Sequence, residues 1–457
     1  MLKNKHTKFL KKLFPGDACL LEAPETLIFT TDSSCLEAEP WAVVRPESEA
    51  QVVELLKWAQ AEKVPIFPRA RASNGIGGVV PRGGGVVVSM LRMNRIVEIG
   101  EDDFLAVVEP GVVTADLQKA VAERGRFYPP DPGSVRFSTI GGNVATGAGG
   151  MSAVKYGVTR EYILGLTAVL AGGEVVRTGG RTHKDAMGYD LTKLLVGSEG
   201  TLALFTQVIV KLLPLPEASA SLLAGFADLG QVLAAARSVF RSGFLPTAME
   251  FMDGPTLKVL AQVRPVPWSA DVGAALLFKL DGSEDALAAD LKKLTGIVRD
   301  AGAFYLQQGF GPEEEEPLWE IRRMISPSMY HVAPTKMSDD IAVPRGRIEE
   351  AVDAFQAIGR DCGVIVYCFG HLGDGNIHVD VMYDEADPAQ RAAMKKAKHA
   401  MYQKVLELHG TLTGEHGVGL LKKPYVSWQL GKAERALMAR VKHAFDPLNI
   451  MNPGKGF

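Results

Sequence analysis

The sequence predicts an α+β protein with two domains and a separate C-terminal segment. At 457 residues, the chain is longer than one hydrophobic core usually supports. Its first half alternates short apolar strands with helices, and its second half repeats a strand–helix unit. Such repetition favours an antiparallel sheet with helices on one face. We place the domains at residues 1–215 and 216–409, followed by the segment 410–457.

The elements of the first half are read from periodicity and from capping residues. Apolar residues recur with helical spacing over 47–63, between the strand-like stretches "WAVV" and "VPIF". The stretch 114–125 reads as a helix that a threonine caps and a glycine ends. Residues 166–180 predict a hairpin, and 202–214 a closing strand. The proline-rich "PLPE" that follows, Pro214–Glu217, marks the first domain boundary.

The second half contains the repeated unit three times, over residues 221–240, 273–298 and 340–370. The run of glutamates at Glu313–Glu316 predicts a solvated loop. From about Gly410 the chain is glycine-rich and then helical, so it is not a fourth copy of the unit.

Composition and charge exclude several classes of protein. A hydrophobic share of 47% and a charged share of 23% are typical of soluble globular proteins. The net charge of −3 gives no reason to expect nucleic acid as a partner. No stretch approaches the ~20 apolar residues of a membrane span. The four cysteines lie far apart without C-x-x-C spacing, which argues against a disulfide scaffold or a thiolate-bound cluster.

These features favour the cytoplasm. The N-terminal "MLKNKHTKFLKKLF" lacks the apolar stretch of a secretory signal and predicts a lysine-rich surface helix. The alternative is an amphipathic helix that touches a partner or lipid, at the inner face of the membrane.

Three segments of the first domain are rich in glycine, serine and threonine: Pro68–Gly78, Pro129–Gly150 and Val196–Val208. Glycine lets several backbone N–H groups point together at an anion, so these loops could hold a diphosphate without lysine. One such loop would be explained by tight turns, whereas three in one domain favour a nucleotide. The motifs G-x-G-x-x-G and G-x-x-x-x-G-K-[ST] are missing, so the site is neither Rossmann-like nor a P-loop.

Two glycine-flanked loops of the second half carry histidines and a glutamate. In "IHVDVM", alternation puts His378 and Asp380 on one face of a strand, and a Gly-Asp-Gly turn separates His378 from His371. Together with Glu415 of "TGEHGVG", the two imidazoles form a plausible ligand set for Zn, Fe or Mn. A histidine pair alone is more often structural. His416 should point away from Glu415 along an extended backbone and titrate near neutral pH.

A third feature is a possible carboxylate anchor. Arg322 and Ser326 share one face of a predicted helix, and Lys336 follows in "PTKMSDDIAVP". Arginine suits bidentate binding of a carboxylate. The alternative, a surface helix with solvated arginines, is the better interpretation for Arg323.

Several motifs in order along the chain resemble those of the FAD-linked oxidases of the vanillyl-alcohol-oxidase fold. They are "TIGGNVATGAGG", "KYGVTREYILGLTAVLAGGEVVRTGG", "GYDLTKLLVGSEGTL" and the terminal "NPGKGF". The most similar group comprises D-lactate dehydrogenase, the glycolate oxidase flavin subunit and D-2-hydroxyglutarate dehydrogenase. The resemblance implies a two-part FAD-binding domain, an antiparallel substrate (cap) domain, and a C-terminal segment that returns to the FAD domain.

The resemblance also implies which residues bind FAD. They lie in the three glycine-rich segments and near the C-terminus: Arg69, Ser73, Asn74, Gly75, Pro132, Gly133, Ser134, Thr139, Gly141, Gly142, Asn143, Gly147, Gly200, Thr201, Val208 and Asn452. The first loop holds no histidine, so FAD should be non-covalent. The family usually has R-G-x-G-T-G there, whereas this chain has alanine at Ala70 and Ala72, which disfavours positive φ.

For the second half, the resemblance implies a divalent metal on His371, His378 and Glu415, with His416 as the catalytic histidine. Arg322, together with Lys336, would hold the substrate carboxylate. Asp380 departs from the family, which often has asparagine at this position, and this change could alter the substrate preference.

We therefore expect FAD-dependent oxidation of a small D-2-hydroxy acid, most simply D-lactate or glycolate, with hydride transfer to flavin N5. Electrons would leave to oxygen, a quinone, a soluble carrier or a separate iron–sulfur subunit, and the chain would be a homodimer or a subunit of a complex. Two alternatives remain: an FAD-binding accessory subunit without its own chemistry, and a metal-dependent hydrolase.

Overall fold

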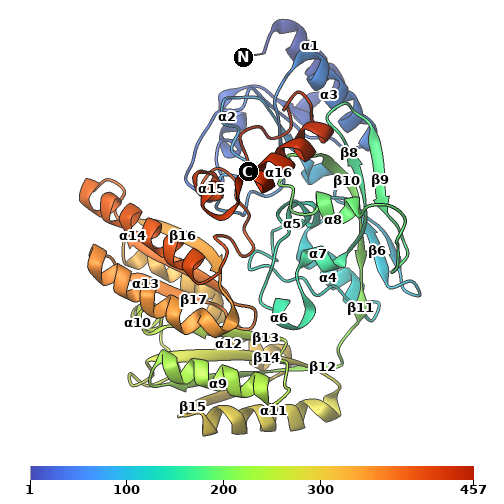
Figure 1. Cartoon of the computed structure of the whole chain (residues 1–457). Helices are drawn as coiled ribbons and strands as arrows, with labels where there is room; N and C mark the ends of the chain where they lie inside the picture. The colour runs from blue at the N-terminus through green and yellow to red at the C-terminus, as the bar shows by residue number, and fades with distance from the viewer. Residues whose placement is uncertain (1, 457) are drawn as a thin grey trace. The chain divides into compact units, whose positions relative to one another are not determined.

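The computed structural model describes residues 2–456 and divides the chain into two compact units (Figure 1). Unit 1 comprises the chain up to Gly149, then Val158–Leu215, and the chain from Glu415 onward. Unit 2 comprises Gly150–Gly157 and Pro216–Gly414. The first division thus falls within the proline-rich stretch, and the second leaves residues 410–414 with unit 2 rather than with the C-terminal segment.

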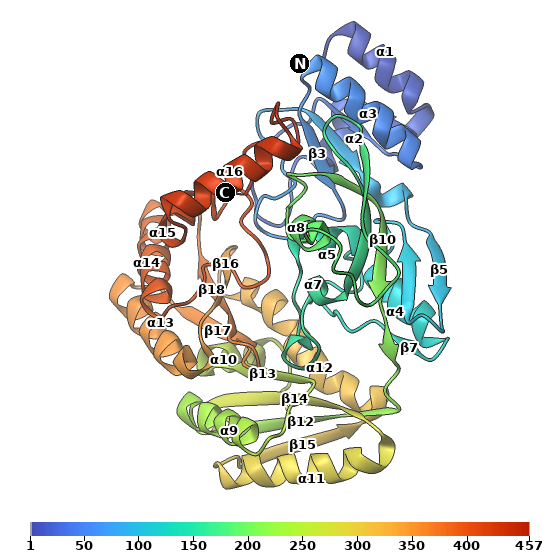
Figure 2. The ribbon, with the colours of Figure 1, turned by 45° about the vertical axis from the view of Figure 1, so that its right-hand side comes forward.

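Unit 1 begins with a small sheet in the order β1-β2-β4-β3: β1 (Cys19–Leu20), β2 (Ala42–Val44), β4 (Val86–Ser89) and β3 (Ile66–Arg69). The last three strands run parallel, and their nearly continuous apolar residues are buried. Helix α3 (Glu49–Glu62) begins where Ser48 accepts a hydrogen bond from the Gln51 backbone N–H. Helix α1 (Asn4–Leu13) lies beside α3 (Figure 2), and the ring of Phe9 stacks on Trp58.

A second sheet of unit 1 has five antiparallel strands in the order β5-β6-β10-β8-β9: β5 (Ile96–Gly100), β6 (Leu105–Val108), β10 (Leu204–Lys211), β8 (Ile163–Val169) and β9 (Val175–Gly179). Strands β8 and β9 form the predicted hairpin, and β10 is the predicted closing strand. Helix α4 (Thr114–Ala122) also forms, but Val113 occupies its N-cap position and Thr114 is already helical.

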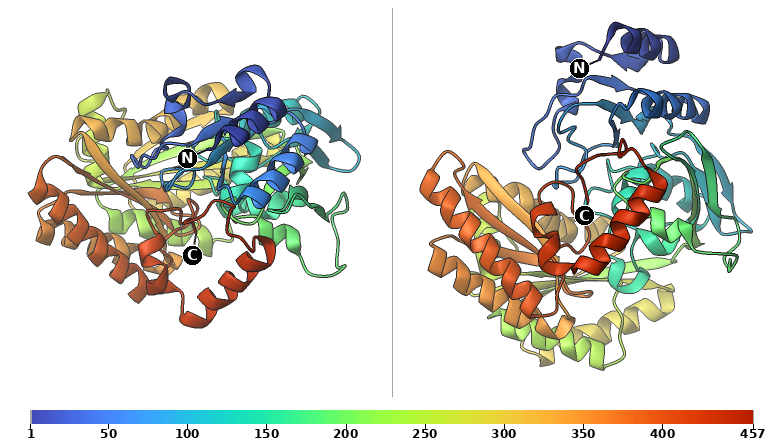
Figure 3. Two further views of the ribbon diagram at one scale, coloured as in Figure 1. Left: turned by 90° about the horizontal axis from the view of Figure 1, so that it is seen from above. Right: turned by 45° about the horizontal axis from the view of Figure 1, so that its top comes forward.

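The C-terminal part of unit 1 contains α15 (Val426–Gln429) and α16 (Lys432–Phe445), at the red end of the chain in Figure 3. Met451 then bridges Ile66 in parallel, and the Asn452 backbone N–H donates to the Ile66 carbonyl at 2.7 Å. The end of the chain is therefore held beside β3, within unit 1.

Unit 2 contains a seven-stranded sheet in which each strand runs antiparallel to its neighbours. In spatial order the strands are β15 (Tyr305–Phe310), β12 (Ala218–Phe226), β14 (Ala274–Gly282), β13 (Ala248–Met252), β17 (Val366–His371), β18 (Asn376–Tyr383) and β16 (Thr335–Ala342). This sheet confirms the predicted α+β class.

Four helices cover one face of this sheet, as predicted: α9 (Leu229–Arg241), α11 (Glu284–Asp300), α13 (Ile348–Cys362) and α14 (Pro388–Glu407). Figures 1 and 3 show α13 and α14 side by side. Two further helices, α10 (Gly254–Val263) and α12 (Gly311–Ser328), share a hydrophobic core with the other face through residues such as Leu277 and Phe369. Helices therefore occur on both faces, and α12 brings polar side chains to the second one.

The prediction of a loop at Glu313–Glu316 is wrong. These residues form the first turns of α12. In a helix, about every third or fourth side chain points to the face that packs on the protein, and among these four glutamates it is Glu315. Its buried carboxylate accepts a hydrogen bond from Ser219 Oγ at 2.6 Å and lies 3.8 Å from Lys279 Nζ.

The longest helix of residues 2–456, α14, contains the four lysines Lys395, Lys396, Lys398 and Lys404. Within the same residues, no helix combines the length and apolar character that crossing a bilayer requires.

Candidate active site

A row of polar side chains lies on the α12 face of the unit 2 sheet. The strand register pairs Asp340 and Phe369 with His378, Ser338 with Asp380, and Glu250 with His371. Directly paired residues project from the same face of a sheet, so this row follows from the register. We call it the polar stripe: Glu250, Lys336, Ser338, Asp340, His371, Asn376, His378 and Asp380. The prediction that His378 and Asp380 face one way is confirmed.

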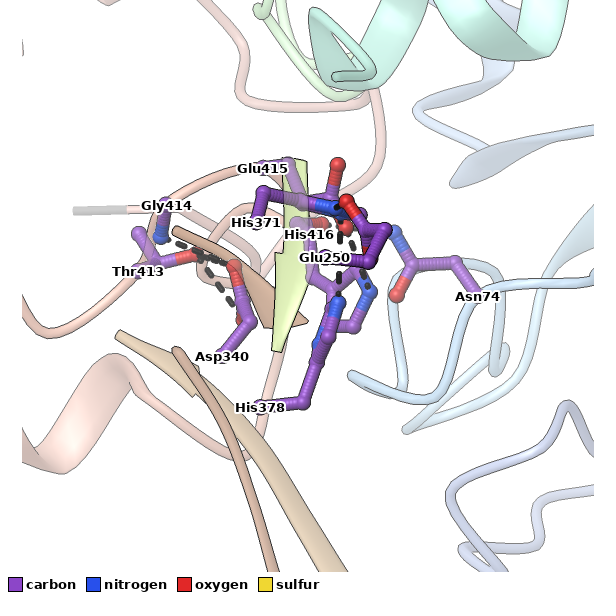
Figure 4. Close-up of polar contacts among 9 residues, drawn as sticks. All are labelled: Asn74, Glu250, Asp340, His371, His378, Thr413, Gly414, Glu415 and His416. Carbon is purple, nitrogen blue, oxygen red and sulfur yellow. Dashed lines mark hydrogen bonds and ion pairs between the residues drawn. The ribbon is translucent and has the colours of Figure 1, made fainter. Parts of the chain in front are cut away.

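The centre of the stripe is a chain of three side chains. Glu250 is fully buried, and its Oε1 lies 2.6 Å from His371 Nδ1. A proton on Nδ1 leaves His371 Nε2 with a lone pair, and this atom lies 3.4 Å from His378 Nε2. Figure 4 shows both imidazoles together with Glu250. The carboxylate fixes the tautomer that a metal-binding histidine needs.

The spacing of the two imidazoles suits a divalent metal. Two metal–nitrogen bonds of about 2.0–2.1 Å at the tetrahedral angle put the nitrogens roughly 3.3–3.4 Å apart. The measured Nε2–Nε2 separation is 3.4 Å. The donor types therefore fit such an ion, and the carboxylate that orients His371 completes a common arrangement around one.

The loop that carries Glu415 is attached to the same stripe. Asp340 is fully buried and accepts hydrogen bonds from the Gly414 N–H at 2.8 Å and from Thr413 Oγ1 at 3.3 Å (Figure 4). A Cβ at Gly414 would overlap the Asn376 amide, so a larger residue there would require this amide to move. Glu415 follows Gly414 directly in the sequence and is the first residue of the C-terminal part of unit 1.

Within unit 1, the loop that follows Glu415 is bent. The prediction that His416 points away from Glu415 along an extended backbone is wrong, because its Nε2 lies 3.7 Å from Glu415 Oε1. Asn74 Nδ2 donates to the His416 carbonyl at 2.6 Å. The Glu199 carboxylate accepts from the N–H groups of Val418 and Gly419, both at 2.8 Å. These bonds, rather than strand geometry, set the path of the loop.

Glu199 was not predicted as a site residue. Burial raises its pKa, and the hydrogen bonds from Val418 and Gly419 act in the opposite direction. Its backbone adopts a left-handed φ of 52°, which is rare for a residue other than glycine. A carboxylate that accepts two backbone hydrogen bonds, on a residue with this rare backbone conformation, indicates a specific role, which here is to clamp the loop of His416.

Arg322 reaches the stripe from α12. Its Nε donates to Glu250 Oε2 at 2.8 Å, and its guanidinium lies 4.9 Å from the centre of the Phe369 ring. This bond uses one of five N–H donors, so the guanidinium retains the capacity to bind a further carboxylate. Interaction with Arg322 and His371 outweighs the burial that would raise the pKa of Glu250, and lowers that pKa to about 2.

Lys336 occupies the other end of the stripe. Its Nζ donates to Ser326 Oγ at 2.5 Å and lies 3.7 Å from Asp380 Oδ2. Ser326 and Arg322 thus both point from α12 toward the sheet, as their spacing predicted, whereas Arg323 pairs with Glu316. Burial raises the pKa of Asp380, and the charge of Lys336 partly opposes this.

The glycine-rich loops of unit 1 meet one another. Helix α5 (Ile140–Thr146) begins at Thr139, whose Oγ1 accepts a hydrogen bond from the Gly142 N–H. A Cβ on Gly142 would lie 3.1 Å from Ala70 Cβ, so the second loop rests on the first. Asn74 Oδ1 and Ser198 Oγ are buried there without a hydrogen-bond partner among residues 2–456. Polar atoms left in this way fit a polar ligand such as a nucleotide.

Several side chains predicted to contact the cofactor are engaged within the protein. The buried guanidinium of Arg69 donates to the carbonyls of Ile28 and Phe29. Val208 is fully buried in the middle of β10, and the amide of Asn452 donates to two carbonyls. Thr201 Oγ1 likewise donates to the Ser198 carbonyl, and Asn143 Nδ2 to Thr114 Oγ1.

The other predicted residues lie in the loops themselves. A Cβ on Gly133 would meet no atom within 4 Å, so this loop is open. Ala72 has a φ of 56°, so the loop keeps the left-handed conformation that its alanine disfavours. The remaining positions are Ser73, Gly75, Pro132, Ser134, Gly141, Gly147 and Gly200.

Family models match both parts of the chain. Residues 40–179 match the FAD binding domain, and residues 215–456 match the C-terminal domain of FAD linked oxidases. The fold and these matches define the class of the protein as an FAD-dependent oxidoreductase. The chain belongs to the FAD-linked oxidases.

Relatives of known name are similar over nearly the whole chain. The glycolate oxidase subunit GlcD of Bacillus subtilis (strain 168) is 39% identical over 432 residues, which cover 94% of this chain and 92% of the relative. The D-lactate dehydrogenase of Anaerostipes hadrus is 35% identical over 442 residues (93% and 92%). The D-2-hydroxyglutarate dehydrogenase of Stutzerimonas stutzeri (strain A1501) is 32% identical over 463 residues (96% and 99%).

Solved structures confirm the fold. The structure of p-cresol methylhydroxylase with substrate bound superimposes with a TM-score of 0.80 at 18% identity, covering 99% of this chain and 96% of that one. Alkyldihydroxyacetonephosphate synthase gives a TM-score of 0.77 at 18% identity, with coverage of 99% and 85%. Both belong to the fold expected from the motifs, and at this identity the likeness concerns the fold alone.

Proposed function

We propose that this chain oxidises a small D-2-hydroxy acid to the 2-keto acid, with FAD as the cofactor. The observation that carries the proposal is the polar stripe, in which a buried Glu250 orients His371 beside His378 and also binds Arg322. A member of the FAD-linked oxidases with such a row has the donors that a hydroxyl and a carboxylate need. Relatives named for glycolate, D-lactate and D-2-hydroxyglutarate support this substrate class.

Side chains of the polar stripe, together with Arg322 and Glu415, would bind and orient the substrate. Arg322, together with Lys336, would hold the carboxylate, since the guanidinium has donors beyond the one that Glu250 uses. His371, His378 and Glu415 would hold a divalent metal such as Zn, Mn or Fe, which supplies Lewis acidity toward the hydroxyl group. Glu250 would keep His371 in the tautomer that leaves Nε2 available.

His416 would act as the general base that takes the hydroxyl proton. Asn74 and Glu199 fix the backbone around it, so the imidazole starts from a defined position. FAD, when bound by the glycine-rich loops, supplies the acceptor for the hydride from C2. An accessory subunit without chemistry would need none of the buried charge that Glu250, His371 and Arg322 bring together.

Electrons would pass to a separate acceptor. The four cysteines have no cluster-binding spacing, so an iron–sulfur centre would belong to another protein. The Bacillus subtilis relative is itself named a subunit. A quinone or a soluble carrier would serve equally, and each can be offered to the purified protein in turn.

A visible spectrum of the purified protein tests the proposal. We expect flavin bands at about 450 nm that bleach with D-lactate or glycolate and not with L-lactate. The variant His416→Asn should keep the bands and lose most of the bleaching. Bands that no 2-hydroxy acid bleaches would instead support an accessory subunit, and a colourless protein with bound zinc would support a hydrolase.

A further inference from the structure

The pairing of charges in the polar stripe limits which acids it can bind. Three carboxylates, Glu250, Asp340 and Asp380, have no exposed surface. Two cations face them, Arg322 from α12 and Lys336 from β16. Arg322 is bound to Glu250 at 2.8 Å, and Lys336 lies 3.7 Å from Asp380. Each cation therefore already has a carboxylate of its own.

The Lys336–Asp380 pair carries no net charge, whichever of the two groups holds the proton. Lys336, which would assist Arg322 at the first carboxylate of the substrate, could attract a second carboxylate only if Asp380 did not offset its charge. An asparagine in place of Asp380 would meet this condition. With aspartate present, the pair offers such a carboxylate no net positive charge to offset the cost of burying it. Charges act strongly on one another where water is excluded, so the effect of this one residue should be large.

Asp380 also retains unused hydrogen-bonding capacity. Lys336 Nζ lies 3.7 Å from Asp380 Oδ2, so both carboxylate oxygens can still accept a closer hydrogen bond. A buried carboxylate in this state is a good acceptor for a neutral donor such as a hydroxyl group. It is a poor neighbour for another carboxylate.

We infer that the Lys336–Asp380 pair makes this enzyme selective for monocarboxylic 2-hydroxy acids with a neutral side group, and against dicarboxylic ones. The inference rests on the proposed function and names the substrate class within it. D-Lactate, glycolate and D-glycerate fall in the favoured class, and D-2-hydroxyglutarate and D-malate in the disfavoured class. Asp380 is thus a specificity-determining residue.

The first test uses the unchanged protein with FAD bound. D-2-Hydroxyglutarate and its 5-methyl ester differ in one negative charge at the distal end. We expect kcat/KM for the ester to exceed that for the free acid by about tenfold or more. Equal values would overturn the inference. If D-lactate also fails to reduce the flavin, the proposed function itself fails, so the two failures are distinguishable.

The second test changes the pair. Asp380→Asn should raise kcat/KM for D-2-hydroxyglutarate relative to D-lactate by about tenfold or more, because Lys336 gains an uncompensated charge. Adding Lys336→Met to this variant should abolish the gain. An unchanged ratio in Asp380→Asn would contradict the inference, and the ester comparison decides the matter if the variant does not fold.

The matched control is Asp339→Asn. Asp339 is a buried aspartate on β16 next to the stripe, but its pairing with Val379 turns it to the other face, where Lys398 Nζ lies at 2.9 Å. Removing its charge should leave the ratio between the two acids unchanged. A shift as large as that of Asp380→Asn would mean that general loss of charge, and not the pair, sets the selectivity.

Discussion

Glu250 Oε1 lies 2.6 Å from His371 Nδ1, and the same carboxylate accepts a hydrogen bond from Arg322 Nε at 2.8 Å through its other oxygen. One fully buried glutamate thus holds a histidine of the candidate metal pair and the arginine proposed to bind the substrate. Removing the charge should affect both partners, and they can be measured separately.

We predict that Glu250→Gln weakens metal binding by about 10-fold to 100-fold, since the neutral amide no longer fixes the tautomer of His371. Metal content after dialysis against increasing chelator measures this. The variant should also unfold at a lower temperature, because Arg322 loses the partner of a buried ion pair. Glu315→Gln is the matched control, since Glu315 is buried elsewhere in unit 2. An unchanged chelator curve for Glu250→Gln would contradict the role of Glu250.

Gly149 limits where Glu415 can lie within unit 1. A Cβ on Gly149 would overlap the Glu415 carboxylate and come within 3.0 Å of its Cβ. We predict that Gly149→Ala displaces Glu415 and lowers metal retention, while the flavin spectrum is kept. Gly180→Ala is the control, because its added methyl would meet no atom within 4 Å. Full metal content in Gly149→Ala would show that Glu415 is not a ligand.

The carboxylate of Glu199 determines the path of the loop that carries His416. Glu199→Ala removes both acceptors for the N–H groups of Val418 and Gly419, and Glu199→Gln keeps one. We predict that kcat falls on the order of 10-fold to 100-fold in the alanine variant, less in the glutamine variant, with a smaller change in KM. The exposed Glu123→Ala serves as the control. If Glu199→Ala loses FAD while kcat per bound FAD is unchanged, the role of Glu199 is purely structural.

The sequence predicted the parts of the site that depend on local periodicity. Alternation in "IHVDVM" put His378 and Asp380 on one face, and helical spacing put Arg322 beside Ser326. Family motifs predicted the histidine pair. These inferences hold because strand and helix periods are fixed by backbone geometry.

The partners that are distant in sequence could not be predicted in this way. Glu250 stands alone in the apolar strand "AMEFM", and a charge in a buried strand is a signal that it is paired. Its partner is 121 residues away, so only the order of the strands identifies His371. Glu199 was not predicted as a site residue because the glycines beside it were interpreted as part of a phosphate-binding loop. The bend at His416 depends on hydrogen bonds from such distant residues.

Asp253 should make the stability of unit 2 depend on pH. It caps α10, where it accepts hydrogen bonds from the N–H groups of Thr256 and Cys368 and from Gln356 Nε2. Burial raises its pKa to about 6 although these bonds oppose the shift, whereas in the unfolded chain its pKa is about 3.8. The folded state therefore binds this proton more tightly between these two values.

Stability from this group is consequently greatest in acid and falls as the pH rises from about 4 to about 6. Between pH 4.5 and pH 7, the two pKa values imply a loss of about 2 kcal/mol from the free energy of unfolding. Asp253→Asn cannot titrate, so its free energy of unfolding should lack this component. Urea unfolding of both proteins at the two pH values measures the difference, with the tryptophans of unit 2, Trp268 and Trp319, as the probe. We expect the gap between wild type and variant to be smaller at pH 7 by about 2 kcal/mol. If the gap is equal at both pH values, Asp253 titrates at its ordinary pKa and its burial carries no penalty.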